Sequence, residues 1–211
     1  MILQLALDRM DIAEAVRLTK EVEDFIDWIE VGTSLIKEFG MKSVKELKQA
    51  FPDKRIVADM KTMDNARYEF EMAFEAGADV ATVMGVSPLV TMDACMEVAS
   101  RLDKTVMIDL MNAKEDQVRK LLTYREAVFC VHVSKDEQEA WGAKHSGEKK
   151  EWQFFDPFVQ WAIAGGITAA SLAHLRKTSN PSIVIVGSAI TKAKNPAKAA
   201  NELKQVIQKG E

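Results

Sequence analysis

The chain has 211 residues, of which 47% are hydrophobic, and it contains 5 Pro and 10 Gly. This composition allows a large buried core, and no shift in composition divides the sequence, so we expect a single domain over residues 1–211. The formal net charge is −4, with 28 basic and 32 acidic residues interspersed along the chain. Without a basic stripe, binding of nucleic acid through phosphate neutralisation is not expected.

The hydrophobic segments and the cysteines indicate where the protein works. No apolar stretch approaches the roughly 18 residues that a membrane span requires. The opening segment has too short an apolar run before Asp8 for a signal peptide. Cys95 and Cys130 lie inside apolar patterns and lack the spacing of metal ligands. We therefore expect a soluble cytoplasmic protein with reduced core cysteines, no membrane partner and no zinc site.

Short apolar runs rich in branched side chains alternate with longer amphipathic stretches along the whole chain. This alternation is typical of strand and helix units in a parallel sheet. The eight runs are residues 2–8, 25–32, 55–61, 79–85, 105–111, 127–133, 159–166 and 182–189. Eight such units predict an α/β fold, the (β/α)8 TIM barrel, although an open Rossmann-like sheet has the same local pattern.

The stretch after the third run shows the clearest helical period. Apolar residues recur there at i, i+4, i+7 and i+8, namely Ala66, Phe70, Ala73 and Phe74. Asp64 is expected as the N-cap of this helix, and Gly77 as its C-cap. Residues 141–152 are the only strongly polar candidate for a long loop.

Residues capable of chemistry gather at the ends of the predicted strands, where the active sites of barrels lie. They are Asp8, Glu30, Asp59, Lys61, Asp109 and His132. Each alone has an ordinary structural explanation, such as helix capping or a surface ion pair, and such pairs contribute little stability. Asp59 and Lys61, however, are two apart on one strand and should point to the same face. The joint occurrence of all six at one rim favours an enzyme.

The last two predicted strands end in small residues instead of charged ones. They are Gly165 and Gly166 after the seventh run, and Gly187 and Ser188 after the eighth. In barrels the loops after these two strands commonly bind phosphate through backbone N–H groups. We therefore expect a phosphate ester as the ligand.

The segment "ADMKTMDNARYEFEMAFEAGADVATVMGV" resembles the 3-hexulose-6-phosphate synthase family, within the orotidine 5′-monophosphate decarboxylase group. The shared D-x-K-x-x-D motif falls on Asp59, Lys61 and Asp64. The resemblance covers nearly the whole chain, including "LQLALD", "IEVGTSLIKEFG", "CVHVSKDEQ" and "IVIVGSAIT". It implies a lyase that condenses formaldehyde with D-ribulose 5-phosphate through an enediolate. The similar 3-keto-L-gulonate-6-phosphate decarboxylase remains the alternative.

The resemblance also implies roles for individual residues. Glu30 and Asp59 match ligands of Mg²⁺, and Lys61 matches the position beside the developing enediolate oxygen. Asp64 matches an acid that reaches into the partner subunit's site, which implies a homodimer with shared active sites. His132 matches a proton-transfer position.

The substrate contacts that the resemblance implies lie at other strand ends. Asp8 matches a contact to a substrate hydroxyl, and the backbone of Gly165, Gly166, Gly187 and Ser188 matches the phosphate site. Lys135 departs from the pattern, since an arginine is expected there in the decarboxylase and an uncharged residue in many synthases. Residues 143–158 match neither family.

Two other functions stay open at this point. A Schiff base on Lys61 would make the protein a metal-independent aldolase, but Asp59 and Asp64 should keep that lysine protonated. A non-catalytic sugar-phosphate binding protein would keep the phosphate loops and lose acid or base residues. No such loss is visible in the sequence.

Overall fold

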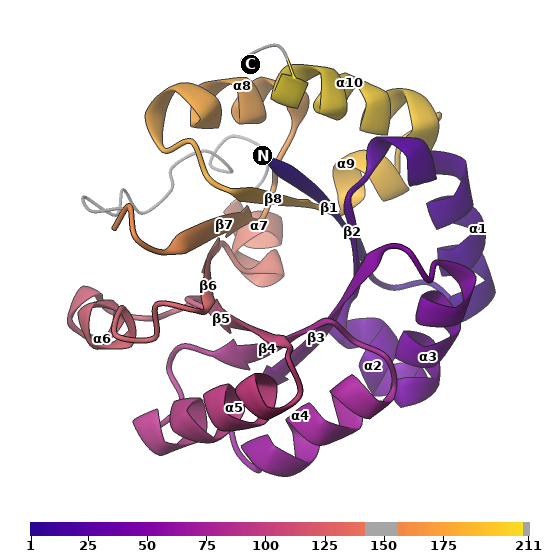
Figure 1. Cartoon of the computed structure of the whole chain (residues 1–211). Coiled ribbons are helices and arrows are strands. Elements are labelled where there is room, and N and C mark those ends of the chain that lie inside the picture. The colour runs from indigo at the N-terminus through magenta and orange to yellow at the C-terminus, as the bar shows by residue number, and fades with distance from the viewer. Residues whose placement is uncertain (142–155, 209–211) are drawn as a thin grey trace.

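The computed structural model describes residues 1–141 and 156–208, and its strands form a closed barrel (Figure 1). All neighbouring strands pair in parallel, and β8 pairs with β1 to close the ring. The strands are β1 (Ile2–Leu7), β2 (Trp28–Val31), β3 (Arg55–Thr62), β4 (Val80–Met84), β5 (Thr105–Asp109), β6 (Val128–His132), β7 (Gln160–Ala164) and β8 (Ile183–Val186). The predicted TIM barrel is confirmed, and the open-sheet alternative is wrong.

The helices surround the strands, as Figure 1 shows. They are α1 (Ile12–Val22), the 3-10 turn η1 (Glu23–Phe25), α2 (Thr33–Phe39), α3 (Met41–Ala50), α4 (Ala66–Glu75), α5 (Leu89–Arg101), α6 (Glu115–Leu121), α7 (Lys135–Trp141), α8 (Ala169–Thr178), α9 (Ser188–Thr191) and α10 (Pro196–Gln208). The second predicted run, 25–32, starts earlier than β2 because its first residue ends η1. The predicted polar loop 141–152 lies outside the described residues beyond Trp141, which ends α7.

The start of α4 differs from the prediction. Asn65 occupies the N-cap position with φ 55°, and Asp64 lies one residue earlier and accepts the Asn65 N–H at 2.7 Å. Asn tolerates the left-handed conformation, so the chain turns into the helix at Asn65 and the predicted N-cap at Asp64 is wrong. At the other end the C-cap is Ala76, and Gly77 follows it with φ 104°. The glycine thus stands one position later than predicted.

Buried side chains form two layers, one between the barrel and the helices and one inside the barrel. The apolar inner layer consists of Trp28, Val57, Val80, Met107, Val128, Cys130, Ala162, Ala164, Ile183 and Ile185. Because strand side chains alternate, residues two positions further along several of these strands also face inward. These are Glu30, Asp59, Thr82, Asp109 and His132, so the barrel interior becomes polar towards the carboxyl ends of the strands.

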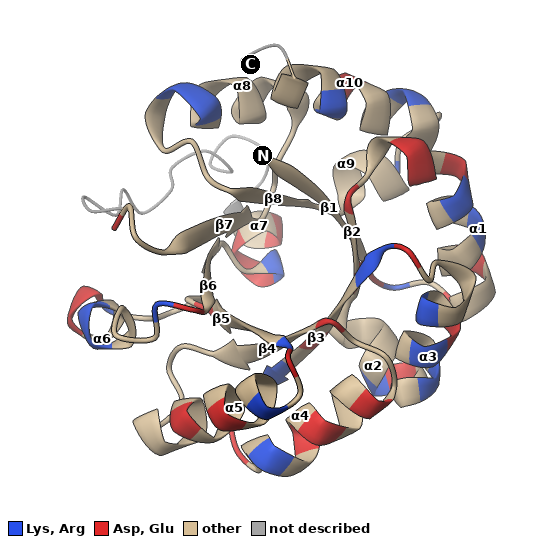
Figure 2. Cartoon of the chain, in the orientation of Figure 1, with Lys and Arg blue, Asp and Glu red and all other residues tan. Residues whose placement is uncertain are grey.

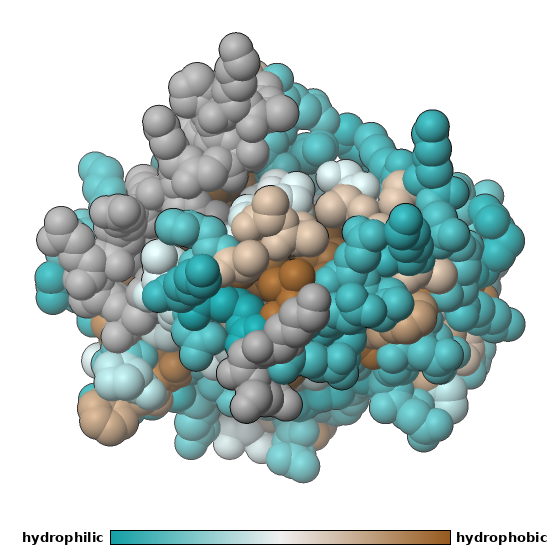
Figure 3. Space-filling model, turned by 90° about the horizontal axis from the view of Figure 1, so that it is seen from above, coloured by the Kyte–Doolittle hydropathy of each residue, from teal (hydrophilic) through white to brown (hydrophobic). Residues whose placement is uncertain are grey.

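The outer surface carries charges of both signs. Figure 2 shows Lys and Arg interspersed with Asp and Glu on the outer helices. In Figure 3 hydrophilic side chains surround a smaller hydrophobic area in the centre of the face shown. Within residues 1–141 and 156–208 no helix combines the length and apolar character needed to cross a bilayer. Both cysteines are buried and unpaired, as the sequence predicts.

Candidate active site

A pocket at the carboxyl-terminal mouth of the barrel gathers five of the six charged residues expected there. Its walls include Glu30, Asp59, Lys61, Asp109 and His132, with Thr82 beside them. The sixth residue, Asp8, follows β1 and is exposed. Its Oδ1 accepts bonds from Ser34 Oγ at 2.7 Å and Ser34 N at 3.2 Å. A Cβ on Gly32 would approach the Asp8 carboxylate to 2.3 Å, so a larger residue at this position would displace the Asp8 side chain.

Lys61 lies between two carboxylates. Its Nζ donates to Asp59 Oδ2 at 2.8 Å, to Asp59 Oδ1 at 3.0 Å and to Asp109 Oδ2 at 3.1 Å. Burial alone would lower the pKa of Lys61, but these carboxylates outweigh burial and raise that pKa. A protonated lysine is a poor nucleophile, so the geometry disfavours the Schiff-base alternative.

A bulge in β3 places Lys61 there. Ala58 pairs with Ala81 of β4, yet the next pair in the register is Thr62 with Val83. Three residues of β3 therefore stand opposite Thr82 alone, and Lys61 adopts φ 47°. A left-handed non-glycine residue costs about 1–3 kcal/mol and persists only where its surroundings impose it. Asp59 and Lys61 are neighbours as predicted, but the bulge brings them together, and simple strand alternation does not.

Asp109 connects Lys61 to His132. His132 Nδ1 lies 2.8 Å from Asp109 Oδ2, and Asp109 Oδ1 accepts the Met111 N–H at 2.9 Å. Burial alone would raise the pKa of Asp109, but His132, Lys61 and the Met111 N–H together lower it to about 2. Asp109 is thus an ionised carboxylate that can orient the imidazole through Nδ1, leaving Nε2 for proton transfer.

Glu30 has the opposite electrostatic environment. It is 8% exposed, and Gln4 Nε2 donates a hydrogen bond to its Oε2. Burial, and after it the charge of Asp59, raises the pKa of Glu30 to about 8. Gln4 Oε1 is buried, and within the described part of the chain it has no hydrogen-bond partner. This side of the pocket therefore has more oxygen acceptors than donors.

Such an excess of oxygen acceptors suits a hard divalent cation. Mg²⁺ usually keeps several waters and binds one or two carboxylates together with substrate oxygens. Glu30 and Asp59 are two such carboxylates, and over the described ranges no group of three or more His, Cys, Asp or Glu forms a fuller metal site. Asp59 already accepts two bonds on each oxygen, because Thr82 Oγ1 donates to Oδ1 at 2.9 Å and Thr33 Oγ1 to Oδ2 at 2.7 Å. A cation that binds Asp59 must therefore replace one of these donors.

The remaining predicted residues lie outside this pocket lining. Asp64 is exposed, and in the described structure Lys61 Nζ bonds to Asp59 and Asp109 instead of Asp64. The expectation that Asp64 holds its own chain's lysine protonated is therefore wrong.

The predicted phosphate residues follow the last two strands. Gly165 and Gly166 follow β7 with φ 95° and 64°, and a Cβ on Gly165 would approach Val133 O to 2.5 Å. Gly187 follows β8 as the N-cap of α9, and Ser188 begins that helix. The positive φ values at Gly165 and Gly166 favour glycine at both positions.

Sequence reasoning missed three polar residues of the site and one role. Gln4, Thr33 and Thr82 each bond to a pocket carboxylate. Asp109 was expected at the rim, but its link between Lys61 and His132 was not. The available signal for Gln4 and Thr82 was a polar residue within an apolar run, as in "ILQLALD" and "DVATVMG".

A parallel barrel whose acids, lysine and histidine converge at the carboxyl ends of its strands has the site architecture of barrel enzymes. The family model described as "Orotidine 5'-phosphate decarboxylase / HUMPS family" matches residues 1–203. The chain belongs to this family, as the resemblance in the sequence predicts.

Individual relatives within this family have two named activities. The 3-hexulose-6-phosphate synthase of Bacillus subtilis is 38% identical over 210 residues, covering 99% of each chain. A solved 3-hexulose-6-phosphate synthase from Salmonella typhimurium has a TM-score of 0.89 and 32% identity over 100% of both chains. A solved 3-keto-L-gulonate-6-phosphate decarboxylase from Vibrio cholerae has a TM-score of 0.84 and 30% identity, covering 99% of this chain and 97% of its own.

Proposed function

We propose that this chain condenses formaldehyde with D-ribulose 5-phosphate to give D-arabino-hex-3-ulose 6-phosphate. The observation that carries the proposal is the contact chain Asp59–Lys61–Asp109–His132, in a protein 38% identical to a named synthase over 99% of its length. These residues supply a base, an ammonium group and oriented carboxylates, which are the groups that enediolate chemistry needs.

In the proposed reaction His132 removes a proton from C1 of the ketose phosphate, and Asp109 holds its ring through Nδ1. The electron pair of the C1–H bond becomes the carbon–carbon double bond of the enediolate. The ammonium of Lys61 faces the negative charge that develops on the substrate oxygens. C1 then attacks the carbon of formaldehyde, and the resulting alkoxide takes up a proton to complete the new hydroxymethyl group.

A divalent cation completes the proposed site. Glu30 and Asp59 would hold Mg²⁺, which would supply further positive charge beside the enediolate oxygens. The support is the buried Glu30, whose pKa is raised to about 8 by burial and by Asp59. A bound cation would keep Glu30 ionised at neutral pH.

The rest of the substrate has proposed partners at the same rim. Asp8, held by Ser34, is proposed to bind a ketose hydroxyl. The backbone of Gly165, Gly166, Gly187 and Ser188 is proposed to bind the phosphate through its N–H groups. Positive φ values at Gly165 and Gly166 support this, since such turns let backbone approach a ligand closely.

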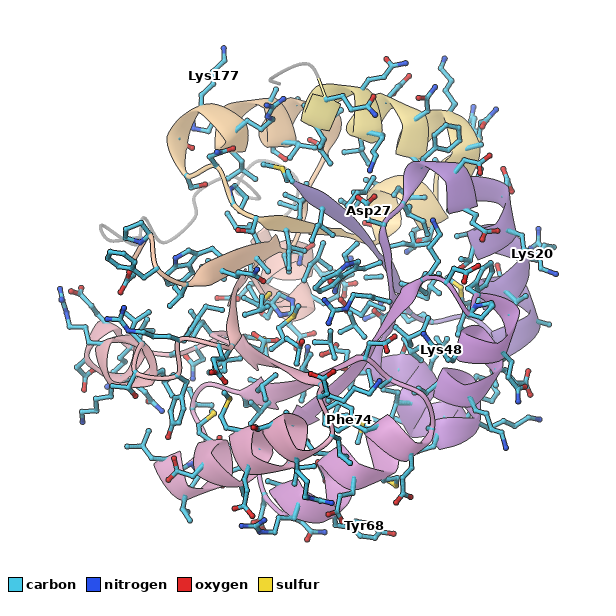
Figure 4. All side chains as sticks on the ribbon, viewed as in Figure 1. Lys20, Asp27, Lys48, Tyr68, Phe74 and Lys177 are labelled. Atoms are coloured by element: carbon cyan, nitrogen blue, oxygen red, sulfur yellow. The ribbon has the colours of Figure 1, made fainter. Side chains whose placement is uncertain are left out.

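A homodimer with shared sites is the proposed assembly. Asp64 follows β3 and is exposed, so its side chain is accessible to a second copy even though Oδ1 accepts the Asn65 N–H. Four exposed apolar side chains belong to the loop before α4, to α4 and to the start of α5, namely Met63, Tyr68, Leu89 and Val90. Figure 4 shows Tyr68 pointing outward from α4. Because α4 and α5 pack against each other, these exposed apolar side chains support an interface on this pair of helices.

Decarboxylation of 3-keto-L-gulonate 6-phosphate is the second candidate function. The TM-score of 0.84 with the Vibrio cholerae decarboxylase supports it. The chemistry does too, because loss of CO₂ from a β-keto acid gives the same kind of enediolate, and one set of residues can serve both reactions.

One paired assay tests the proposal. Purified protein with Mg²⁺ is given ribulose 5-phosphate plus formaldehyde in one reaction and 3-keto-L-gulonate 6-phosphate in another. We expect kcat/KM to be larger for the condensation, and a larger value for decarboxylation would replace the proposed function. Excess chelator should abolish both activities. Full activity in chelator, with borohydride trapping of substrate on Lys61, would support a Schiff-base aldolase, and no turnover of either substrate would support a sugar-phosphate binding protein.

A further inference from the structure

The hydroxyl of Thr82 contacts both members of the Asp59–Lys61 pair. Thr82 lies in β4 and is 2% exposed. Its Oγ1 donates to Asp59 Oδ1 at 2.9 Å and accepts the backbone N–H of Lys61 at 2.9 Å. A hydroxyl has one proton and two lone pairs, so it can make both bonds at once. An isosteric valine can make neither.

The position of Thr82 opposite the bulge explains why both bonds are needed. Residues 59–61 of β3 face this single residue of β4. The N–H of Lys61 is therefore out of register with the sheet, and it takes the threonine hydroxyl as its acceptor. A buried N–H without an acceptor is unfavourable, so the hydroxyl favours the φ of 47° at Lys61 over an extended backbone.

We propose that Thr82 is a positioning residue that holds the β3 bulge and thereby aims Lys61 Nζ and the Asp59 carboxylate into the pocket. The expected effect on catalysis rests on the proposed function. The role of Thr82 in holding the bulge does not depend on that function. Thr33 also bonds to Asp59, on Oδ2 and on the backbone oxygen. Thr82 differs from Thr33 because it also fixes the backbone of the lysine.

The first measurement is steady-state kinetics of Thr82→Val. Loss of a residue that orients a catalytic group typically costs 10- to 100-fold, so we expect kcat to fall by roughly that factor. KM for ribulose 5-phosphate should change by less than about threefold, because the phosphate contacts lie after β7 and β8. A general loosening of the barrel would instead change both constants.

Two further variants isolate the hydroxyl. Thr82→Ser keeps it and should retain kcat within about threefold, whereas Thr82→Ala should resemble Thr82→Val. The serine and alanine variants differ by one oxygen, so they decide the point if the valine variant does not fold. Thr19→Val is a matched control, because Thr19 is fully buried in α1 and its hydroxyl has no partner among the described residues. We expect wild-type kinetics from this control.

The second measurement does not depend on any activity. Hydrogen exchange of the Lys61 amide, followed by NMR in substrate-free protein, reports directly on the bond to Thr82. We expect exchange about tenfold faster or more in Thr82→Val and Thr82→Ala, and wild-type protection in Thr82→Ser. Amides of β4 and β5 away from the bulge should keep their protection.

Either of two results overturns the inference. One is a kcat within about twofold of wild type in both variants without the hydroxyl, and the other is unchanged Lys61 exchange in those variants. Failure of the proposed function looks different, because the wild-type protein itself would then lack condensation activity. In that case kcat of the same variants is compared with 3-keto-L-gulonate 6-phosphate as substrate. The hydrogen-exchange measurement needs no change, because it uses substrate-free protein.

Discussion

Both ends of the barrel contain acid–lysine clusters, but lysines outnumber acids at the amino end and acids outnumber lysines at the carboxyl end. At the amino end, just before β4, Asp79 accepts bonds from Lys48 at 2.9 Å, Lys104 at 3.0 Å and the Ile56 N–H at 3.0 Å. Burial alone would raise the pKa of Asp79, but these donors together lower it. Each group in this cluster has a complementary partner.

A second amino-end acid follows the same rule. Asp27 accepts both the Leu3 N–H and the ammonium of Lys204, with the closer Lys204 contact at 2.7 Å. Figure 4 labels Asp27 and Lys48, which belong to these two clusters. The clusters tie α3, α10 and the strand starts together, and each carboxylate in them contacts at least one ammonium group.

The mouth is unbalanced by comparison. Its pocket brings three carboxylates, those of Glu30, Asp59 and Asp109, around one lysine and one histidine. The pKa of Glu30 rises to about 8, whereas that of Asp109 falls to about 2. Two nearby carboxyl groups with such different environments are typical of a functional site. The comparison teaches that acid–lysine contacts stabilise the fold at one end and leave charge for a ligand at the other.

The largest expected effect comes from removing a carboxylate at the mouth. Asp59→Asn should lower kcat/KM by on the order of 10³, because it removes a proposed cation ligand and turns an amide towards Lys61. Lys61 keeps Asp109 as a partner and the asparagine oxygen can still accept bonds, so the free energy of unfolding should fall by about 2 kcal/mol, less than the roughly 4 kcal/mol equivalent of the rate loss. Kinetics and urea unfolding of the same preparation measure the two effects. A loss of stability that matches the loss of rate would contradict the assignment of this end to function.

The next effect is a pH dependence caused by Glu30. A carboxyl group whose pKa is raised on folding binds its proton more tightly in the folded state, so stability falls as pH rises from 4.5 to about 8. In metal-free protein Glu30→Gln should remove this loss and raise the free energy of unfolding by on the order of 4 kcal/mol at pH 8, with little gain near pH 5. Urea unfolding of both proteins in chelator, from pH 4.5 to about 8, measures this difference in the free energy of unfolding.

The exposed Glu75 provides a matched control for that experiment. Glu75→Gln removes the same charge outside the pocket and should leave the wild-type pH slope unchanged. Saturating Mg²⁺ should reduce the advantage of Glu30→Gln, because the cation binds the wild-type carboxylate. A pH slope that persists in Glu30→Gln would assign it to another group.

The barrel and most of its site acids could be predicted from the sequence for a physical reason. Strands buried on both faces read as continuous apolar runs, and the ends of such runs locate the mouth. Pairing between strands could not be predicted in the same way. The bulge at Lys61 depends on the register between β3 and β4, and the bond from Gln4 to Glu30 joins residues 26 positions apart. The left-handed Asn65 likewise depends on how the chain enters α4.

Asp64 is the predicted contribution of a second copy of the chain to the site at the mouth. If it orients Lys61 of the partner, Asp64→Asn should lower kcat by on the order of 10² while leaving the barrel folded. A purely local role, such as its bond to the Asn65 N–H, predicts little change in rate, because an asparagine oxygen can accept the same bond.

Mixing Asp64→Asn with Lys61→Ala protein tests the shared site. A mixed dimer would carry one site with both changes and one with neither, so part of the activity should return on subunit exchange. No recovery despite demonstrated exchange would place both residues in the site of one chain.

The smallest expected effect belongs to the amino end. Asp79→Asn leaves Lys48 and Lys104 without their carboxylate, although the asparagine oxygen can still accept the Ile56 N–H. Because the Asp79 side chain is 19% exposed, water partly replaces the lost contacts. We expect a loss of about 2 kcal/mol in the free energy of unfolding, with kcat and KM unchanged. Lys42→Ala is the control, since its i,i+4 pair with Glu46 is exposed and contributes little. A fall in kcat in Asp79→Asn at temperatures where the protein is fully folded would show that the amino-end cluster supports the chemistry as well as the fold.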